Sequence, residues 1–239
     1  MKKDSILVGI IGLLVGLIVG FIFANNINQR GQAGAVVAQQ PNAQLPPDHP
    51  PITANGQQSG PDMVAVQDAI NLAKSDQNNF AAQMKAADYS YQVQRFDDAI
   101  QFLTRANQLQ PDSYDALVQL GNVNFDANRF PEAERWYTLA LEKKPDDVNV
   151  RTDLGLTFLL REPANLERAI TEFRASLARE PKHLQTLQNL TVALTRKGDT
   201  AEARSVLAKL EEVSPGNPAI TNLRAELDKQ VTAKANTAR

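Results

Sequence analysis

The chain has 239 residues, with 27 acidic against 25 basic side chains and a formal net charge of −2. This balance lacks the basic excess that is typical of nucleic-acid-binding proteins, so no nucleic-acid partner is expected. Cysteine is absent, which excludes disulfides, thiol catalysis, a lipid-modified cysteine and cysteine-ligated zinc.

The N-terminal part predicts a membrane anchor. Residues 1–5 carry Lys2 and Lys3, and residues 6–24 are uncharged and apolar. As a helix this stretch spans about 28 Å, close to the ~30 Å of a hydrocarbon core. Because positive charge stays on the cytoplasmic side, we expect a cytoplasmic N-terminus and an extracytoplasmic remainder, periplasmic if the chain is bacterial. An uncleaved signal anchor is favoured, and cleavage after Ala24 is the alternative.

Three glycines in the predicted span recur every fourth residue: Gly12, Gly16 and Gly20. They form a small-residue face on which another membrane helix could pack closely. This pattern predicts homo-oligomerisation or docking on a membrane partner. The alternative is that glycine is simply common in such helices.

Residues 25–60 predict a disordered linker, because they are rich in Asn, Gln, Pro and Gly and carry only two charges, Arg30 and Asp48. Their root-mean-square reach is about 30–36 Å. His49 lies among prolines that could form a short recognition motif, but one histidine without a companion ligand predicts no metal site. Residues 61–79 predict an N-terminal capping helix, whose spacing does not match the periodicity that follows.

The stretch from residue 80 to 217 is periodic. An alanine is followed twelve residues later by a proline four times, and Pro111, Pro145, Pro181 and Pro215 lie 34, 36 and 34 residues apart. A period in this range is typical of stacked helical repeats. Within residues 114–147, Gly121 and Ala133 are small where two amphipathic helices would approach each other, and Pro145 ends the second helix.

The pattern Leu120-Gly121, Phe130, Ala133, Tyr137, Ala140 and Pro145 resembles the tetratricopeptide repeat in order and spacing. The resemblance implies an all-α, right-handed α-solenoid of about four helix hairpins, at residues 80–113, 114–147, 148–183 and 184–217. The third unit has two extra residues in its internal turn. Residues 218–232 predict a half-polar C-terminal capping helix, and residues 233–239 predict a tail that frays.

In this family the first helix of each unit lines a concave groove that binds peptides. By resemblance that role falls on Met84, Asp88, Tyr91 and Gln92, on Val118, Asn122, Phe125 and Asp126, on Thr152, Leu156, Leu159 and Leu160, and on Gln188, Val192, Thr195 and Arg196. Tyr91, Phe125 and Leu159 occupy equivalent places and predict a stripe along the groove. The alternative is that part of the stripe is buried between units.

The chemistry expected of this groove is partner binding. Equivalent positions 84, 118, 152 and 188 carry no cation, so a clamp for a carboxylate tail is not favoured, and a partly apolar extended or helical segment fits better. Trp136 could pack on the convex side or anchor a partner. No catalytic motif, cofactor site or metal-ligand spacing occurs, so we expect no enzyme.

The sequence therefore predicts a membrane-tethered interaction scaffold whose groove binds a protein partner outside the cytoplasm. One alternative is a chaperone-like factor of c-type cytochrome biogenesis, because the membrane-anchored repeat proteins of that process have a similar layout. Another is a structural subunit of an envelope, secretion or pilus complex.

Overall fold

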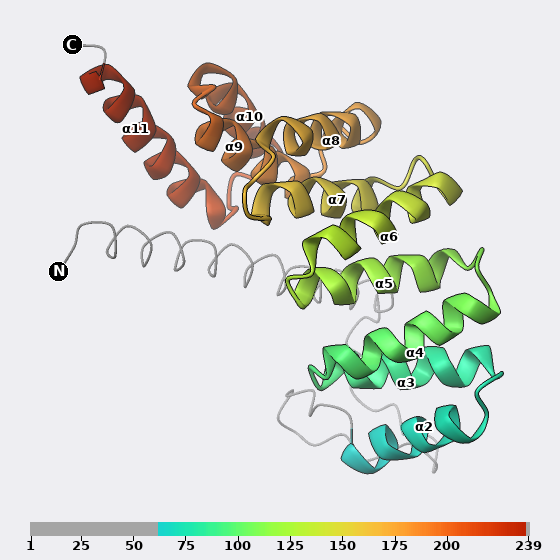
Figure 1. Cartoon of the computed structure of the whole chain (residues 1–239). Coiled ribbons are helices and arrows are strands. Elements are labelled where there is room, and N and C mark those ends of the chain that lie inside the picture. Colours follow the sequence, from blue (N-terminus) through green and yellow to red (C-terminus); the bar gives the residue numbers. More distant parts are fainter. Residues whose placement is uncertain (1–61, 238–239) are drawn as a thin grey trace, which may run out of the picture. The chain divides into compact units, whose positions relative to one another are not determined.

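The computed structural model describes residues 62–237, and this part of the chain contains ten helices and no strand (Figure 1). The helices are α2 (Met63–Ser75), α3 (Phe80–Gln92), α4 (Phe96–Leu109), α5 (Tyr114–Asp126), α6 (Phe130–Lys143), α7 (Val148–Leu160), α8 (Leu166–Arg179), α9 (Leu184–Lys197), α10 (Thr200–Val213) and α11 (Ala219–Thr237). The fold class of this part is all-α, as predicted. The last helix continues five residues beyond the predicted end at residue 232.

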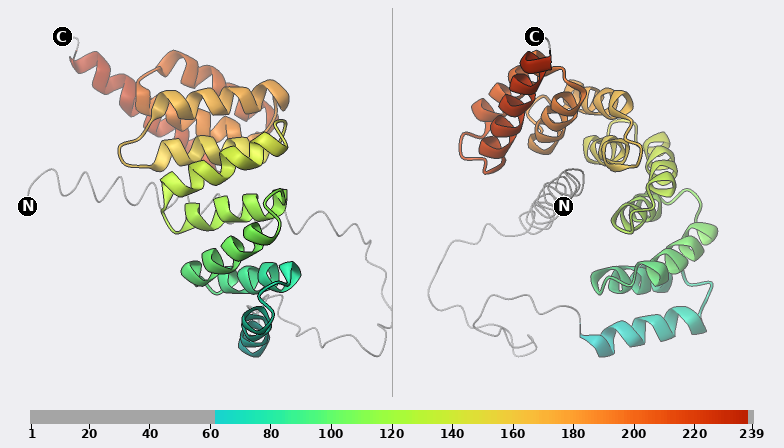
Figure 2. Two further views of the ribbon diagram at one scale, coloured as in Figure 1. Left: turned by 45° about the vertical axis from the view of Figure 1, so that its right-hand side comes forward. Right: turned by 60° about the vertical axis from the view of Figure 1, so that its left-hand side comes forward.

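The helices stack in chain order from α2 to α11 (Figures 1 and 2). Each hairpin packs on itself, as α3 does on α4 and α5 on α6, and each second helix packs on the first helix of the next hairpin. First helices also touch each other directly, since α7 contacts α9 and α9 contacts α11, whereas no two second helices make a comparable contact. The first helices of the described stack therefore lie on the inner side of its curve.

Side-chain caps fix where several helices begin. Polar residues at the N-cap accept hydrogen bonds from backbone N–H groups of the first turn, which have no partner inside the helix. The capping side chains are Asp62 for α2, Asn79 for α3, Ser113 for α5, Asp147 for α7 and Asn165 for α8.

The turn between successive hairpins has one recurring pattern of backbone hydrogen bonds. The residue after the second helix donates to a carbonyl four residues earlier, and its own carbonyl accepts from the residue three positions later. This pattern joins Gln110 to Ser113, Lys144 to Asp147, Glu180 to His183 and Ser214 to Asn217. The same two bonds join Asp76 to Asn79, between α2 and α3.

This turn relates the N-terminal helix to the repeats in a way that the sequence periodicity did not reveal. α2 lies where the second helix of a preceding hairpin belongs, and α11 lies where the first helix of a following hairpin belongs. The helix itself was predicted, but its place in the repeat was not, because Gln77 stands where the other turns carry Pro111, Pro145, Pro181 or Pro215. Hydrogen bonding through Asp76 and Asn79 forms the turn without the proline.

Small residues allow the helices of one hairpin to approach each other, as predicted. A Cβ on Gly121 would lie 2.4 Å from Cδ1 and Cε1 of the Tyr137 ring, and one on Gly155 would lie 2.6 Å from Cε1 of Phe173. Tyr137 and Phe173 are buried, so neither ring has room to move away.

The turns inside the hairpins use left-handed backbone geometry at equivalent places. Gln94, Asn128 and Gly198 have φ of 60°, 58° and 88°. Gly198 is the C-cap of α9, a place where helices commonly end on a left-handed glycine. In the third hairpin the chain is two residues longer, and Asn165 N–H still donates to the Phe158 carbonyl at 2.9 Å, as Arg129 does to Asn124 at 2.8 Å.

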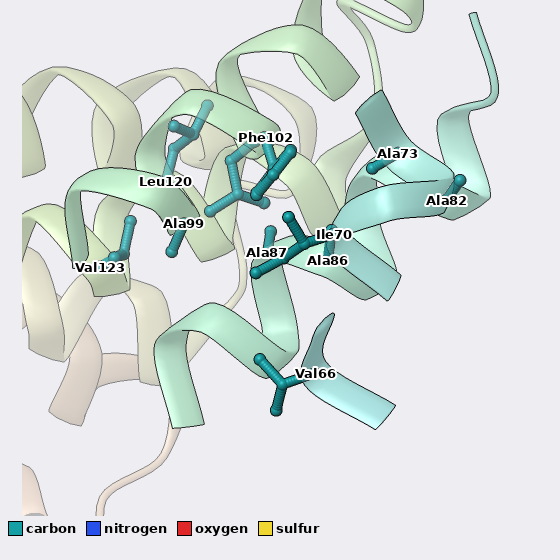
Figure 3. Close-up of a cluster of buried hydrophobic side chains, with 11 residues drawn as sticks. Val66, Ile70, Ala73, Ala82, Ala86, Ala87, Ala99, Phe102, Leu120 and Val123 are labelled. Atoms are coloured by element: carbon teal, nitrogen blue, oxygen red, sulfur yellow. The ribbon is translucent and has the colours of Figure 1, made fainter. Parts of the chain in front are cut away.

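The apolar core runs continuously between the layers. At its N-terminal end Val66, Ile70 and Ala73 of α2 pack with alanines of α3, and Figure 3 shows Ile70 beside Ala86 and Ala87. Ala99, Phe102 and Leu103 of α4 continue the same cluster. At the other end Ile220, Leu223 and Leu227 bury the inner face of α11.

None of the helices between residues 62 and 237 is both long and apolar enough to cross a membrane. The predicted anchor at 6–24, its glycines Gly12, Gly16 and Gly20, and the predicted linker at 25–60 lie outside the described residues.

Candidate functional site

The candidate groove residues of α3 and α5 remain accessible. Each is exposed or half-buried: Met84, Asp88, Tyr91 and Gln92 on α3, and Val118, Asn122, Phe125 and Asp126 on α5. We call this set the α3–α5 surface. Because both helices belong to the inner layer, the surface faces the inside of the curve.

Two aromatic rings of this surface each pack against a phenylalanine of the following helix. Tyr91 packs against Phe96 with ring centroids 6.0 Å apart, and Phe125 packs edge-on against Phe130 at 5.7 Å. Phe96 and Phe130 are the first residues of α4 and α6, one repeat apart. Each ring is therefore positioned by the second helix of its own hairpin, which lowers the entropy lost when a ligand packs on it.

A hydrogen bond joins the two hairpins across this surface. The Tyr91 hydroxyl donates to Oδ2 of Asp126. On α3 itself, Nε2 of Gln92 donates to Oδ2 of Asp88 at 2.8 Å. Both carboxylates thus have a donor within the surface, and their negative charge opposes an acidic ligand.

Asn122 is oriented by its own hairpin. The Tyr137 hydroxyl donates to Oδ1 of Asn122 at 3.0 Å. Nδ2 of Asn122 makes no hydrogen bond within residues 62–237, so this amide presents donors to the inner side of the curve. A fixed amide donor on a surface that also carries aromatic rings suits a backbone carbonyl of a bound peptide.

Several predicted groove residues of α7 and α9 are buried, which corrects their assignment to an open surface. The buried set is Thr152, Leu156 and Leu159 on α7, and Gln188 and Thr195 on α9. Leu160 and Val192 are half-buried and Arg196 is exposed. The predicted aromatic and aliphatic stripe therefore stops at Phe125, because Leu159 is only 2% exposed.

Polar contacts explain two of these burials. The Thr152 hydroxyl donates to the Val148 carbonyl at 2.7 Å and lies 2.6 Å from Oγ1 of Thr186, inside the packing of α7 on α9. Nε2 of Gln188 donates to Oδ1 of Asn217 at 3.0 Å, which ties α9 to the turn before α11. α7 is moreover apolar almost all round from residue 154 to 160, and a helix of this kind is a buried one.

Comparison with known proteins identifies the fold family. A family model described as tetratricopeptide repeat matches residues 90–152 and 160–227, which together make up more than half of the chain. The chain belongs to the tetratricopeptide repeat family. A search among curated proteins finds no match.

Solved structures with the same fold show how this tetratricopeptide repeat chain compares. A crystal structure of MamA is 21% identical, has a TM-score of 0.58, and aligns 63% of this chain with 86% of that one. MamA from Desulfovibrio magneticus RS-1 is 17% identical with a TM-score of 0.60, over 65% and 87% of the two chains. YrrB, described as a TPR protein with an unusual peptide-binding site, is 18% identical with a TM-score of 0.61, over 68% and 83%.

Arg196, the predicted cation of the tetratricopeptide groove, is partly engaged. Its Nη1 donates to the Leu159 carbonyl at 2.9 Å, so the side chain bridges α9 to α7. Trp136 is half-buried and packs against the N-terminal core, with the Arg135 guanidinium 5.0 Å from its ring centroid. Of the two predicted roles for Trp136, packing on the second-helix side agrees with this contact.

Hydrogen bonds between neighbouring first helices of the tetratricopeptide stack were not predicted. Tyr114 donates to Asp147, and Nε2 of His183 lies 3.1 Å from Oδ1 of Asn149. Thr152 and Thr186 form a third pair. These partners lie 33 or 34 residues apart, so the sequence signal was a polar residue recurring at the repeat length. Within residues 62–237, no cluster of His, Asp or Glu could hold a metal ion.

Proposed function

We propose that this tetratricopeptide repeat protein binds a segment of a partner protein on the α3–α5 surface. The observation that carries the proposal is the set of positioned groups there: Tyr91 and Phe125 held by Phe96 and Phe130, and the Asn122 amide held by Tyr137. The rings supply apolar contact and the amide a directional donor, which are the two components of peptide recognition in grooves.

The charge of the α3–α5 surface limits which partner segments can bind there. Asp88 and Asp126 lie beside the rings, so a segment with an acidic end is disfavoured and one with a basic or neutral side chain is preferred. YrrB, which has the same fold, is described as binding peptide at an unusual site, and this precedent supports a binding role. The proposed ligand is an extended or helical segment with an apolar residue for each ring.

Site-specific crosslinking tests this proposal. A photoreactive phenylalanine analogue replaces Val118 in the full chain in native membranes, and the captured peptide is mapped by mass spectrometry. We expect one recurrent partner segment, whose yield falls when Tyr91→Ala and Phe125→Ala are introduced together. The matched control places the same analogue at Gln101, an exposed residue of α4. Equal capture at both positions would contradict the proposal.

We further propose that residues 6–24 tether the domain to a membrane and that the repeats lie outside the cytoplasm. The support is the apolar length of this stretch and the position of Lys2 and Lys3 before it. Because the chain has no cysteine, a single introduced one reports its own side of the membrane. A membrane-impermeant maleimide should label Ser205→Cys, on the exposed side of α10, in cells whose inner membrane is intact, and should not label Ser5→Cys. The opposite labelling would reverse the proposed orientation.

A further inference from the structure

The N-terminal end of the stack is an unfinished repeat. α2 takes the place of a second helix and packs on α3, and in the part of the chain that the structure describes no first helix precedes it. Val66, Ile70 and Ala73 bury the side of α2 that faces the next hairpin (Figure 3). The side that would face its own first helix is therefore open.

The register of the repeats shows how apolar this open side is. The recurring turn aligns Leu72 with Ala106, Ala140, Ser176 and Leu210, each of which is 0% exposed, whereas Leu72 is 50% exposed. Met63 and Val64 are 61% and 64% exposed, and these three are the large apolar side chains that stand out as exposed among residues 62–237. All three lie on α2.

The opposite end of the stack is built differently. On α11 the positions that would face a following second helix carry exposed Thr221, Arg224, Ala225 and Asp228. Arg224 donates to Oε1 of Glu211 at 2.6 Å, so this face is polar and paired within the chain. The C-terminal end is suited to water, as terminal repeats require, and the N-terminal end is not.

The segment one repeat length before α3 has a composition unsuited to a first helix. One repeat length before α3, residues 46–58 would have to form it, and they include Pro46, Pro47, Pro50 and Pro51. α3, α5, α7 and α9 contain no proline, because a proline inside a helix removes a hydrogen bond and clashes with the preceding turn. The absence of a suitable segment at this distance favours an occupant from another chain.

The third hairpin serves as a template for that occupant. Asp68 aligns with Glu172, and Glu172 accepts from Nη1 of Arg151 at 2.9 Å across the α7–α8 contact. A helix placed on α2 as α7 is placed on α8 would bring its corresponding residue to Asp68. A basic residue at that position would thus be paired with a carboxylate.

Two more contacts of the template define apolar positions. Leu72 aligns with Ser176, which lies 3.3 Å from Thr152, the residue directly after Arg151. Val64 aligns with Arg168, whose guanidinium lies 5.1 Å from the ring centroid of Phe158. Phe158 follows Arg151 by two helical turns. An occupant thus needs apolar residues directly after its basic residue and two turns later.

We propose that the open face of α2, formed by Val64, Asp68 and Leu72, binds an amphipathic α-helix of another protein that completes the repeat. The bound helix carries a lysine or arginine opposite Asp68, with an apolar residue beside it on Leu72 and a large apolar residue two turns later on Val64. This surface is separate from the α3–α5 surface and does not depend on it.

A helix of the chain's own first-helix type is the probe. A fluorescent peptide with the sequence of residues 147–161 and the change Thr152→Leu contains Arg151, an apolar residue directly after it, and Phe158 in the required register. Its anisotropy is measured against the full chain in mild detergent. Leu72→Glu should weaken binding about tenfold, because it places a charge where apolar surface is buried. Asp68→Lys should weaken binding about threefold, and a peptide with Arg151→Glu should recover that loss on the Asp68→Lys protein.

Controls separate this face from the rest of the molecule. Ala208→Glu, on the exposed side of α10, should leave peptide binding unchanged. Phe125→Ala, which should impair the α3–α5 surface, should also leave it unchanged, so the two proposals fail independently. Leu72→Glu should keep the melting temperature of the parent chain, since Leu72 is half exposed.

Two outcomes would overturn the proposal. The first is peptide binding that is insensitive to both Leu72→Glu and the charge exchange at Asp68. The second is a dimer of the full chain that Leu72→Glu converts to a monomer in light scattering, because a second copy of this chain would then be the occupant.

Discussion

The hydroxyl of Tyr114 donates a hydrogen bond of 2.5 Å to Oδ2 of Asp147, while Oδ1 of the same carboxylate accepts from Val150 N–H at 3.0 Å. One side chain thus caps α7 and ties it to α5. Asp147→Ala should lower the free energy of unfolding by about 2 kcal/mol, because the cap and the tie are lost together. Tyr114→Phe should cost about 1 kcal/mol, since it removes only the tie. Urea denaturation measures both, and equal losses would contradict this division.

Burial and the bond to Asp147 raise the pKa of Tyr114 above its usual value near 10. The folded protein therefore keeps the phenol protonated where the unfolded chain begins to ionise. Stability from this group is complete below about pH 10 and falls above it. The difference in melting temperature between the parent chain and Tyr114→Phe should shrink between pH 9 and pH 11, and a constant difference would contradict the assignment.

The contact of Gly121 with Tyr137 leaves no room for a methyl group. Gly121→Ala should destabilise the protein by about 1–3 kcal/mol, because its Cβ would lie 2.4 Å from a buried ring. Gly216→Ala is the matched control, since nothing lies within 4 Å of its Cβ. Adding Tyr137→Leu to Gly121→Ala should recover part of the loss. Thermal denaturation that shows equal effects at the two glycines would refute the steric argument.

At the left-handed positions inside the hairpins, introducing a glycine and removing one should have opposite effects on stability. Gln94→Gly should stabilise by about 1 kcal/mol, because a φ of 60° strains a residue that has a Cβ. Gly198→Ala should destabilise by about 1 kcal/mol for the same reason. Asn128→Gly should change little, since asparagine tolerates this region. Denaturant midpoints should rank the three variants in this order.

Glu172 is 7% exposed and accepts from Arg151 and Arg168 at 2.9 and 3.4 Å. Glu172→Ala should cost about 3 kcal/mol, because it leaves the Arg151 charge without its partner. The double change Glu172→Met with Arg151→Met should cost much less than Glu172→Ala, because the charge that then loses its partner, on Arg168, is 57% exposed to water. The exposed pair Arg204 and Asp228 is the control, and breaking it should cost less than about 1 kcal/mol.

His183 should make the stability of the protein depend on pH in the acidic range. Burial lowers its pKa below 6.5, against the opposing effect of Glu180 and Asp147. The unfolded chain therefore takes up this proton first, and stability is lost as the pH falls below about 6.5. His183 occupies the N-cap position of α9, and asparagine suits this position, as it does at Asn79 before α3. Between pH 7.5 and pH 5.5, the melting temperature of the parent chain should fall further than that of His183→Asn. Equal falls would exclude His183 as the cause.

The hairpins could be predicted from the sequence because their signals are local. Gly121 opposite Tyr137, and the prolines after the second helices, each depend on residues within one unit. The place of α2 could not be predicted, since its turn to α3 forms through Asp76 and Asn79 without the proline on which the periodicity was read. Backbone hydrogen bonds show the equivalence that residue types conceal.

The binding surface was predicted only in part, because exposure depends on residues of the next repeat. Equivalent positions gave the same expectation for Phe125 and Leu159, yet the first is half-buried and the second is buried. The signal that distinguishes them was present in the second half of α7, where residues 154–160 carry a single polar side chain, Thr157. A groove residue on so apolar a stretch of helix should have been expected in the interior.

The third hairpin is two residues longer at its tip, yet Asn165 still donates to Phe158 as Arg129 does to Asn124. The backbone hydrogen bond that closes the turn inside a hairpin therefore forms whether or not the turn contains two additional residues. By contrast, the junctions between hairpins repeat the same two bonds wherever they occur. Residues 161–164 are thus the natural insertion point for an epitope or a fluorophore tag. A longer turn between two hairpins would instead change how all the following hairpins pack on the preceding ones.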